Sequence, residues 1–250
     1  MKKKFFNQNR IGFMQGRLVD KIKKKIQYFP DNNWYEEIKL AKSEKFNLME
    51  WTINYENIKK NPLFNGKIKK LSKIISNNEF QIKSVTCDFF MQKPFFKEKL
   101  NYKKKQYIKD VIKVIKNCNK LKFKYIILPL VDNSSILNIK QEKDLIQTIK
   151  KEIFPQLKNL KILFEIDYEP RKILTFIKKF NSNKVGINYD TGNSASLNYN
   201  IIDEMKYFKY VKNIHIKDRK KFGNTVRLGM GNWNYKVFFN QIKKINYKGN

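Results

Sequence analysis

The stretch GINYDTGNSASLNYN, residues 186–200, joins a short apolar run to a series of small polar residues. Its Asp190-Thr191-Gly192 matches the triplet that aspartic proteases carry at their active site. Pepsin-like proteases are all-β and bring two copies of the triplet together, whereas this chain has one copy. The segments around the stretch therefore decide whether Asp190 is a protease carboxylate, a metal ligand or a turn residue.

The stretch lies within an alternation of strand-like and helix-like segments. Continuous apolar runs are typical of strands that are covered on both faces. They occur at Ile11–Met14, Leu48–Trp51, Ile82–Thr86, Tyr125–Pro129, Ile162–Ile166, Val185–Tyr189 and Asn213–Ile216. Helical periodicity with lysine-rich outer faces occurs at Trp34–Lys45, Lys67–Ile75, Tyr102–Cys118, Gln141–Lys158, Arg171–Phe180, Ile201–Phe208 and Tyr235–Ile245. This order predicts parallel strands joined by right-handed helical crossovers.

Seven β-α units in 250 residues predict a (β/α)₈ TIM barrel, formed as a single domain over residues 1–250. An eighth strand would follow Tyr247, so we expect a barrel that lacks its last βα unit or a sequence cut short before it. An open doubly wound sheet is the alternative. It usually carries a glycine-rich phosphate loop after the first strand, and Gln15-Gly16-Arg17-Leu18 has no such motif. The unpaired edge strands of an incomplete barrel favour a homo-oligomer.

The net charge of +32 does not by itself indicate a nucleic-acid partner. Nucleic-acid readers usually show clustered arginine, but only five of the 54 basic residues are arginine and the lysines spread along most of the chain. We attribute the excess to codon bias and expect no nucleic-acid partner, although the charge favours anionic small molecules such as sugar phosphates. Two cysteines are too few for a disulfide framework, and the apolar run 125–131 is too short to cross a bilayer. We therefore expect a cytoplasmic protein without a membrane partner.

Polar side chains end three consecutive predicted strands: Glu165, Asp190 and His215. In a parallel barrel the carboxyl ends of the strands form the active site, so we expect these three to meet. Carboxylate and imidazole ligands suit Mn²⁺, Co²⁺, Mg²⁺, Zn²⁺ or Fe²⁺. Glu165 lies in an apolar run, where a carboxylate needs a metal or a cationic partner. A structural histidine, a Glu–Lys pair at the rim and a turn aspartate are the alternatives.

Four further residues are candidates for substrate contact. Asn193 could bond a substrate hydroxyl or hold Asp190, with helix capping as the alternative. Lys217 and Arg219 could meet a phosphate or carboxylate, with solvated rim charges as the alternative. Trp51 could form an apolar wall for a sugar or be a core aromatic. We also expect glycine 192 to turn the chain away from the strand end.

The motifs FEID (164–167), INYDTGNSAS (187–196) and NIHIKDR (213–219), with IGFMQGRL (11–18) and EW (50–51), resemble the xylose isomerase-like TIM barrels. The likeness is greatest to the bacterial sugar phosphate isomerase/epimerase group and covers essentially the whole chain. It implies that Glu165, Asp190 and His215 hold a divalent metal such as Mn, Co, Mg or Zn. A fourth ligand, typically a glutamate on strand eight, has no position here.

The resemblance also implies an isomerase or epimerase of carbohydrate metabolism that acts on a sugar or sugar phosphate. Proton transfer would pass through a metal-stabilised enediolate, and Glu165 would be both ligand and acid/base. Asp218 and Glu50 are the candidates for a second carboxylate, with rim salt bridges as the alternative. A non-catalytic barrel that binds a sugar or a partner protein is the competing hypothesis. An endonuclease IV-like AP endonuclease needs several histidine ligands, and the chain has one histidine.

Overall fold

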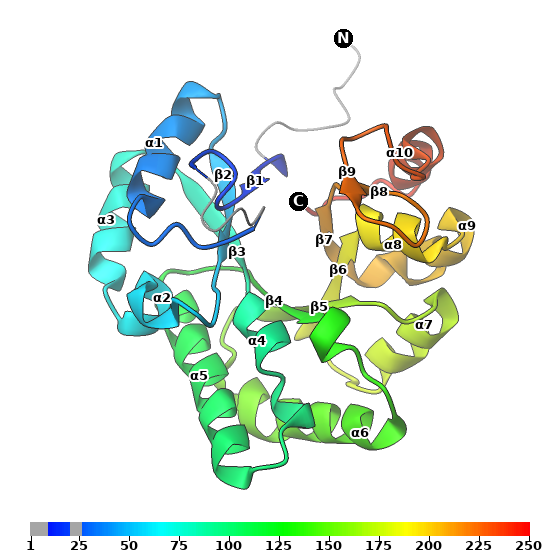
Figure 1. The fold of residues 1–250 in the computed structure, drawn as a ribbon, viewed down its shortest axis with the longest axis horizontal. Helices are drawn as coiled ribbons and strands as arrows, with labels where there is room; N and C mark the ends of the chain where they lie inside the picture. Colours follow the sequence, from blue (N-terminus) through cyan, green and yellow to red (C-terminus); the bar gives the residue numbers. More distant parts are fainter. Residues whose placement is uncertain (1–9, 21–26) are drawn as a thin grey trace. The chain divides into compact units, whose positions relative to one another are not determined.

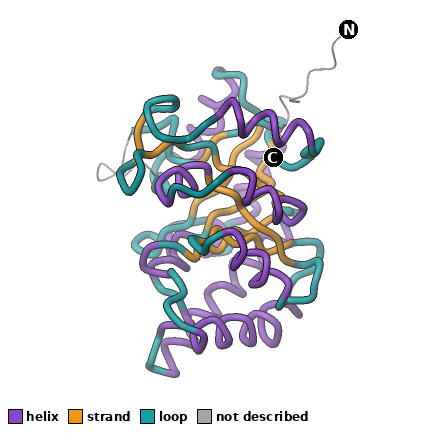
Figure 2. The backbone as a smooth tube through the Cα atoms, turned by 90° about the vertical axis from the view of Figure 1, so that its right-hand side faces the viewer, coloured by secondary structure: helices purple, strands orange, loops and turns teal. Residues whose placement is uncertain are grey.

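The computed structural model describes residues 10–20 and 27–250, which alternate strands with helices along the chain (Figures 1 and 2). The chain divides into an N-terminal unit that ends at Ile162 and a C-terminal unit that begins at Leu163. The seven strands of the main sheet follow one another in chain order, from β1 to β7. The pairs β1–β2, β2–β3, β3–β4 and β6–β7 are parallel. The expected α/β fold of the TIM-barrel type, with seven strands in the described part, is confirmed.

The N-terminal unit contains the first four strands, and their positions agree with the apolar runs of the sequence. Its strands are β1 (Phe13–Met14), β2 (Leu48–Thr52), β3 (Gln81–Thr86) and β4 (Tyr125–Leu130). Its helices are α1 (Trp34–Ser43), α2 (Pro62–Asn65), α3 (Ile68–Asn77), α4 (Asp88–Gln92), α5 (Asn101–Lys120) and α6 (Ile139–Thr148), with short 3₁₀ segments at Ile58–Lys60, Phe95–Lys97, Asp132–Ser134 and Phe154–Gln156. The helix expected over 141–158 is shorter than predicted, because a π-helical segment (Ile149–Ile153) follows α6.

Strand β2 is buried on both faces, as its continuous apolar run predicted. Trp51 has no exposed surface and packs on Trp34 of α1 and on Phe29, with ring centroids 5.6 Å apart in each pair. Its indole N–H donates to Asn61 Oδ1 at 3.1 Å. Residues alternate between the two faces of a strand. Because Trp51 faces α1, the adjacent Glu50 faces the side of β2 away from α1.

The loop after β1 is built around a buried carboxylate of α1. The backbone N–H groups of Gly16, Arg17 and Leu18 donate to Glu37 at 2.7 to 3.1 Å. Burial raises the pKa of Glu37, while these N–H groups lower it; the net direction is upward. The glycine of the loop adopts φ +88°, and a Cβ there would lie 2.4 Å from the carbonyl oxygen of Tyr28. The loop therefore binds a side chain of its own unit.

The C-terminal unit contains the later strands and a hairpin. Its elements are β5 (Lys161–Ile166, which begins two residues before the unit), α7 (Pro170–Lys178), β6 (Val185–Asp190), α8 (Thr191–Leu197), α9 (Ile201–Glu204), β7 (Val211–His215), β8 (Asp218–Arg219), β9 (Thr225–Val226) and α10 (Tyr235–Lys244). The predicted helix over 201–208 is α9 followed by a 3₁₀ segment, Met205–Tyr210. Helix α8 and the antiparallel β8–β9 hairpin were not predicted.

The core of the C-terminal unit is a cluster of aromatic rings on one face of β6. Tyr189 stacks on Phe238 of α10, with centroids 5.5 Å apart and an interplanar angle of 13°, and it also contacts Phe208 and Trp233. Side chains alternate between the two faces of a strand. Because Tyr189 points into this core, its neighbours Asn188 and Asp190 point to the opposite face of β6. Within the described residues, no helix is both long and apolar enough to cross a membrane.

Candidate metal centre

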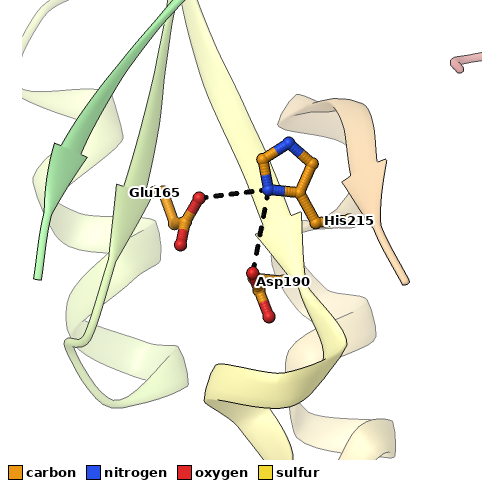
Figure 3. A group of neighbouring side chains, drawn as sticks. All are labelled: Glu165, Asp190 and His215. Carbon is orange, nitrogen blue, oxygen red and sulfur yellow. Dashed lines mark ion pairs between the residues drawn. The ribbon is translucent and has the colours of Figure 1, made fainter. Parts of the chain in front are cut away.

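Three side chains meet at the ends of strands β5, β6 and β7: Glu165, Asp190 and His215 (Figure 3). One ligand atom from each lies within 4.8 Å of the others. His215 Nδ1 is 3.3 Å from Glu165 Oε2 and 3.7 Å from Asp190 Oδ2. The residues are 7%, 4% and 8% exposed, respectively. The structure thus brings together the three residues that the strand-end pattern singled out.

The register of β6 and β7 explains this meeting. Asp190 pairs with His215 and Asn188 pairs with Asn213 across the two parallel strands. Residues at paired positions point to the same face, and residues two apart on a strand share a face. The four side chains therefore form two layers on the face opposite the aromatic core. Asp190 and His215 are the last residues of their strands, so their side chains lie at the rim.

The two oxygens of Asp190 have separate roles. Asp190 is the N-cap of α8, and its Oδ1 accepts from Gly192 N at 2.8 Å and Asn193 N at 3.0 Å. Its Oδ2 faces the cluster and lies 2.8 Å from Lys217 Nζ. Burial raises the pKa of Asp190, but the Lys217 ammonium and His215 outweigh it and hold the pKa below its usual range. Asp190 is thus a carboxylate with one oxygen directed at His215 and Lys217.

Both oxygens of Glu165 are held by amides. Asn193 Nδ2 donates to Oε1 and Asn188 Nδ2 donates to Oε2, each at 2.9 Å. Asn213 Nδ2 donates to Asn188 Oδ1 at 2.8 Å, which orients the Asn188 NH₂ group toward the cluster. That group also lies 3.1 Å from His215 Nδ1. The amides therefore present an oriented carboxylate and an oriented imidazole.

Asn188 was missed by the sequence analysis. Its signal is its position two residues before Asp190, which places both side chains on one face of β6. It was read only as part of an apolar run. Two of the predicted substrate residues contact the cluster directly: Asn193 donates to Glu165, and Lys217 pairs with Asp190. Arg219 Nη1 donates to Asn193 Oδ1 at 3.3 Å. Whether they meet a substrate stays a prediction.

The segment after His215 is tied to the start of α8. Lys217 N donates to Thr191 Oγ1 at 2.8 Å, and Thr191 Oγ1 donates to the Lys217 carbonyl. Gly192 does not turn the chain away from β6, because α8 begins at Thr191 and includes it. A Cβ on Gly192 would lie 2.9 Å from Lys217 Cβ and 3.1 Å from Asp190 Oδ1. This glycine is needed for close packing between α8 and the segment after β7.

Asp218 organises the glycine-containing loop that follows it. Gly229 N and Gly231 N each donate to Asp218 Oδ2 at 2.9 Å, and Trp233 N donates to Oδ1 at 3.2 Å. A Cβ on Gly231 would lie 2.0 Å from Asp218 Oδ1. These backbone donors are therefore engaged by a carboxylate of the protein itself.

The two remaining candidates, Glu50 and Trp51, belong to the N-terminal unit. Glu50 accepts hydrogen bonds from the hydroxyls of Ser84 (2.7 Å) and Thr86, its neighbours on β3. Trp51 has the surroundings of a core aromatic, as described above. Roles for both in substrate binding stay predictions.

A further buried carboxylate of this unit, Glu204, was not predicted. It accepts from Tyr189 Oη and Ser194 Oγ at 2.6 Å and from Tyr207 Oη at 3.3 Å. Burial raises its pKa to about 7, against the opposing effect of these three hydroxyls. A cavity of about 20 Å³, room for about one water molecule, is lined by Glu204, Asp190 and other residues of this unit. Glu204 connects α9 to β6 and α8, the elements that carry the site.

The donor set fits a divalent cation. Two carboxylates and one imidazole are ligands that Mn²⁺, Co²⁺, Zn²⁺ and Fe²⁺ accept, and the carboxylates also suit Mg²⁺. Asp190 Oδ2 is buried and makes an ion pair but accepts no hydrogen bond from the described residues. Such an oxygen, close to two further donors, is the kind of atom that a metal would complete.

Comparison with known proteins places this geometry in a family. The family model described as xylose isomerase-like TIM barrel matches residues 38–250. The chain belongs to this family. The resemblance inferred from the strand-end motifs is thereby confirmed. No curated protein sequence matches the chain.

Solved structures of the same fold include several sugar epimerases. D-allulose 3-epimerase from Methylomonas sp., in complex with D-allulose, has a TM-score of 0.73 at 11% identity. The match covers 95% of this chain and 81% of the epimerase chain. The 3-keto-D-glucoside 4-epimerase from E. coli has a TM-score of 0.69 at 14% identity, covering 96% and 89%. The IolI protein with a bound zinc atom has a TM-score of 0.72 at 14% identity, covering 95% and 85%. At these identities the likeness shows the fold.

Proposed function

We propose that this protein is a divalent-metal-dependent isomerase or epimerase of a sugar or sugar phosphate. The observation that carries the proposal is the buried cluster of Glu165, Asp190 and His215, with donor atoms within 4.8 Å of one another at three strand ends. Membership in the xylose isomerase-like family supports it, as do the sugar epimerases and the zinc-bound protein among the similar structures.

Glu165, Asp190 and His215 would hold the metal through Glu165 Oε2, Asp190 Oδ2 and His215 Nδ1. A divalent cation bound there supplies Lewis acidity that polarises a substrate carbonyl. Asn188 orients Glu165 and His215 through one NH₂ group, while the N-cap bonds of Asp190 leave Oδ2 directed at the site.

Glu165 is the proposed base. Proton removal from the carbon next to a carbonyl needs a carboxylate held in place, and amides fix both oxygens of Glu165. Return of the proton to the neighbouring carbon gives an isomer, and return to the opposite face of the same carbon gives an epimer. Asn193, Lys217 and Arg219 are the residues proposed to meet substrate oxygens at the rim.

Metal binding tests the site. Asp190→Ala and His215→Ala should each abolish Mn²⁺ or Co²⁺ binding measured by calorimetry, because each removes one of three ligands. Asp203→Ala is the matched control: it removes an exposed carboxylate of α9 that pairs with Lys206. The site is refuted if the Asp190 and His215 variants bind the metal as tightly as the parent and the control.

Solvent exchange tests the reaction. The metal-loaded protein in D₂O should introduce deuterium at the carbon next to the carbonyl of a sugar, detected by NMR. The panel contains D-allulose, D-fructose, D-tagatose and their phosphate esters. Similar structures include an epimerase in complex with D-allulose, a D-tagatose 3-epimerase-like protein and an epimerase in the presence of D-fructose. Glu165→Gln should abolish exchange, while Glu169→Gln, which changes the N-cap of α7, should not. Exchange by the Glu165 variant at the parent rate would exclude this residue as the base.

A further inference from the structure

We propose that Lys217 is an internal competitor for the metal: its ammonium pairs with the Asp190 oxygen that a cation would use and must be displaced when a cation binds. The inference rests on the metal site of the proposed function and adds a device that sets the affinity of that site. It concerns one ion pair, which joins the rim to the ligand cluster.

The ammonium is placed on the oxygen that a metal would use. Lys217 Nζ lies 2.8 Å from Asp190 Oδ2, the oxygen that is 3.7 Å from His215 Nδ1. The other oxygen, Oδ1, is engaged by the backbone N–H groups of Gly192 and Asn193. Lysine and metal therefore need the same carboxylate oxygen.

The side chain can leave while its backbone stays. The Lys217 carbonyl accepts from Tyr235 Oη at 2.8 Å and from Thr191 Oγ1, and its N–H donates to Thr191 Oγ1. Its side chain is 26% exposed and carries the ammonium on a flexible four-carbon stem. The ammonium can therefore rotate toward solvent, or toward an anionic group of a ligand, without movement of the main chain.

Electrostatics opposes binding of both cations to Asp190 at the same time. A divalent cation and an ammonium on one oxygen repel each other, and the Asp190 side chain is only 1% exposed, so solvent and salt screen this repulsion little. The metal must therefore displace the ammonium or bind more weakly beside it. The same ammonium offsets part of the negative charge of the two carboxylates in the cluster.

Mn²⁺ binding measured by calorimetry at constant pH and salt tests the inference. Lys217→Met keeps the stem and removes the charge, and it should bind Mn²⁺ about tenfold more tightly or better. Lys217→Arg keeps the charge and should bind as the parent does. Lys220→Met is the matched control, because it removes an equal charge from an exposed residue nearby and should leave the affinity close to that of the parent. Equal or weaker binding by Lys217→Met would overturn the inference.

A second readout is thermal stability without metal. Lys217→Met should melt at a lower temperature than the parent, because Asp190 loses its nearest cation, and saturating Mn²⁺ should raise its melting temperature more than that of the parent. If this variant does not fold, Lys217→Gln replaces it in both measurements. Equal shifts with Mn²⁺ in variant and parent would contradict the competition.

The failures of the two proposals can be told apart. If Asp190→Ala still binds Mn²⁺, the metal site itself is wrong and the inference falls with it. If Asp190→Ala loses Mn²⁺ while Lys217→Met binds no more tightly than the parent, the metal site stands and the competition alone is refuted.

Discussion

Glu204→Gln should remove a pH-dependent loss of stability between about pH 5 and about pH 8. Glu204 is 1% exposed and accepts hydrogen bonds from three hydroxyls, with no cation among its described hydrogen-bond and ion-pair partners. Burial raises its pKa from 4.5 to about 7. Between these two pH values the folded state keeps a proton that the unfolded state has released. The free energy of unfolding therefore falls as pH rises through this window.

The size of the effect follows from the two pKa values. A rise from 4.5 to about 7, at about 1.4 kcal/mol per pKa unit, costs the folded state about 3 kcal/mol once Glu204 is ionised. Most of this is lost between about pH 5 and about pH 8. Glutamine cannot ionise, so in the variant this part of the pH dependence should disappear.

Urea denaturation gives the free energy of unfolding of parent and variant at each of the two pH values. The change between the two pH values is then compared between parent and variant. Asp203→Asn is the matched control on the same helix. The hydrogen bond and charge of Lys206 lower the pKa of Asp203, so it is ionised in both states throughout the window and its variant should keep the pH dependence of the parent. The reasoning fails if Glu204→Gln loses stability with pH as steeply as the parent does.

Three further substitutions test the packing that positions the site. Phe238→Ala should lower the free energy of unfolding by about 3 to 5 kcal/mol, measured in urea, because it empties the centre of the aromatic core; a change below about 1 kcal/mol would contradict this. Gly231→Ala should lower the melting temperature, because its Cβ would overlap the Asp218 carboxylate; an unchanged melting curve would show that the loop is held otherwise. Thr191→Val should cost about 1 to 3 kcal/mol, because it leaves the backbone N–H of Lys217 without its hydroxyl acceptor; a neutral effect would count against that bond.

Much of the fold could be predicted from the sequence because parallel strands that are covered on both faces form continuous apolar runs. The run that begins at Val185 matches β6, and the run that ends at Ile166 matches β5, each to within one residue. Helix α8 was missed because its small polar residues lack an apolar stripe. Its start depends instead on the Asp190 side chain as N-cap.

The site was predictable as a set of residues and not as an arrangement of atoms. Chemistry-bearing residues at strand ends were visible in the sequence, and Glu165, Asp190 and His215 do meet. Asn188 was not found, because an amide within an apolar run becomes meaningful only when its neighbours on the adjacent strands are known. Glu204 was not found, because its raised pKa arises from burial, which no local sequence pattern shows.

The sequence by itself determined the order of strands and helices and placed a carboxylate, a second carboxylate and an imidazole at three successive strand ends. These properties are local, since they depend on apolar periodicity and on which residue follows each run. Only the tertiary structure decided that Asp190 Oδ1 caps α8 while Oδ2 faces His215 and Lys217. The physical reason is that the register between β6 and β7 brings together residues 25 positions apart, and no local pattern specifies which oxygen then meets which partner.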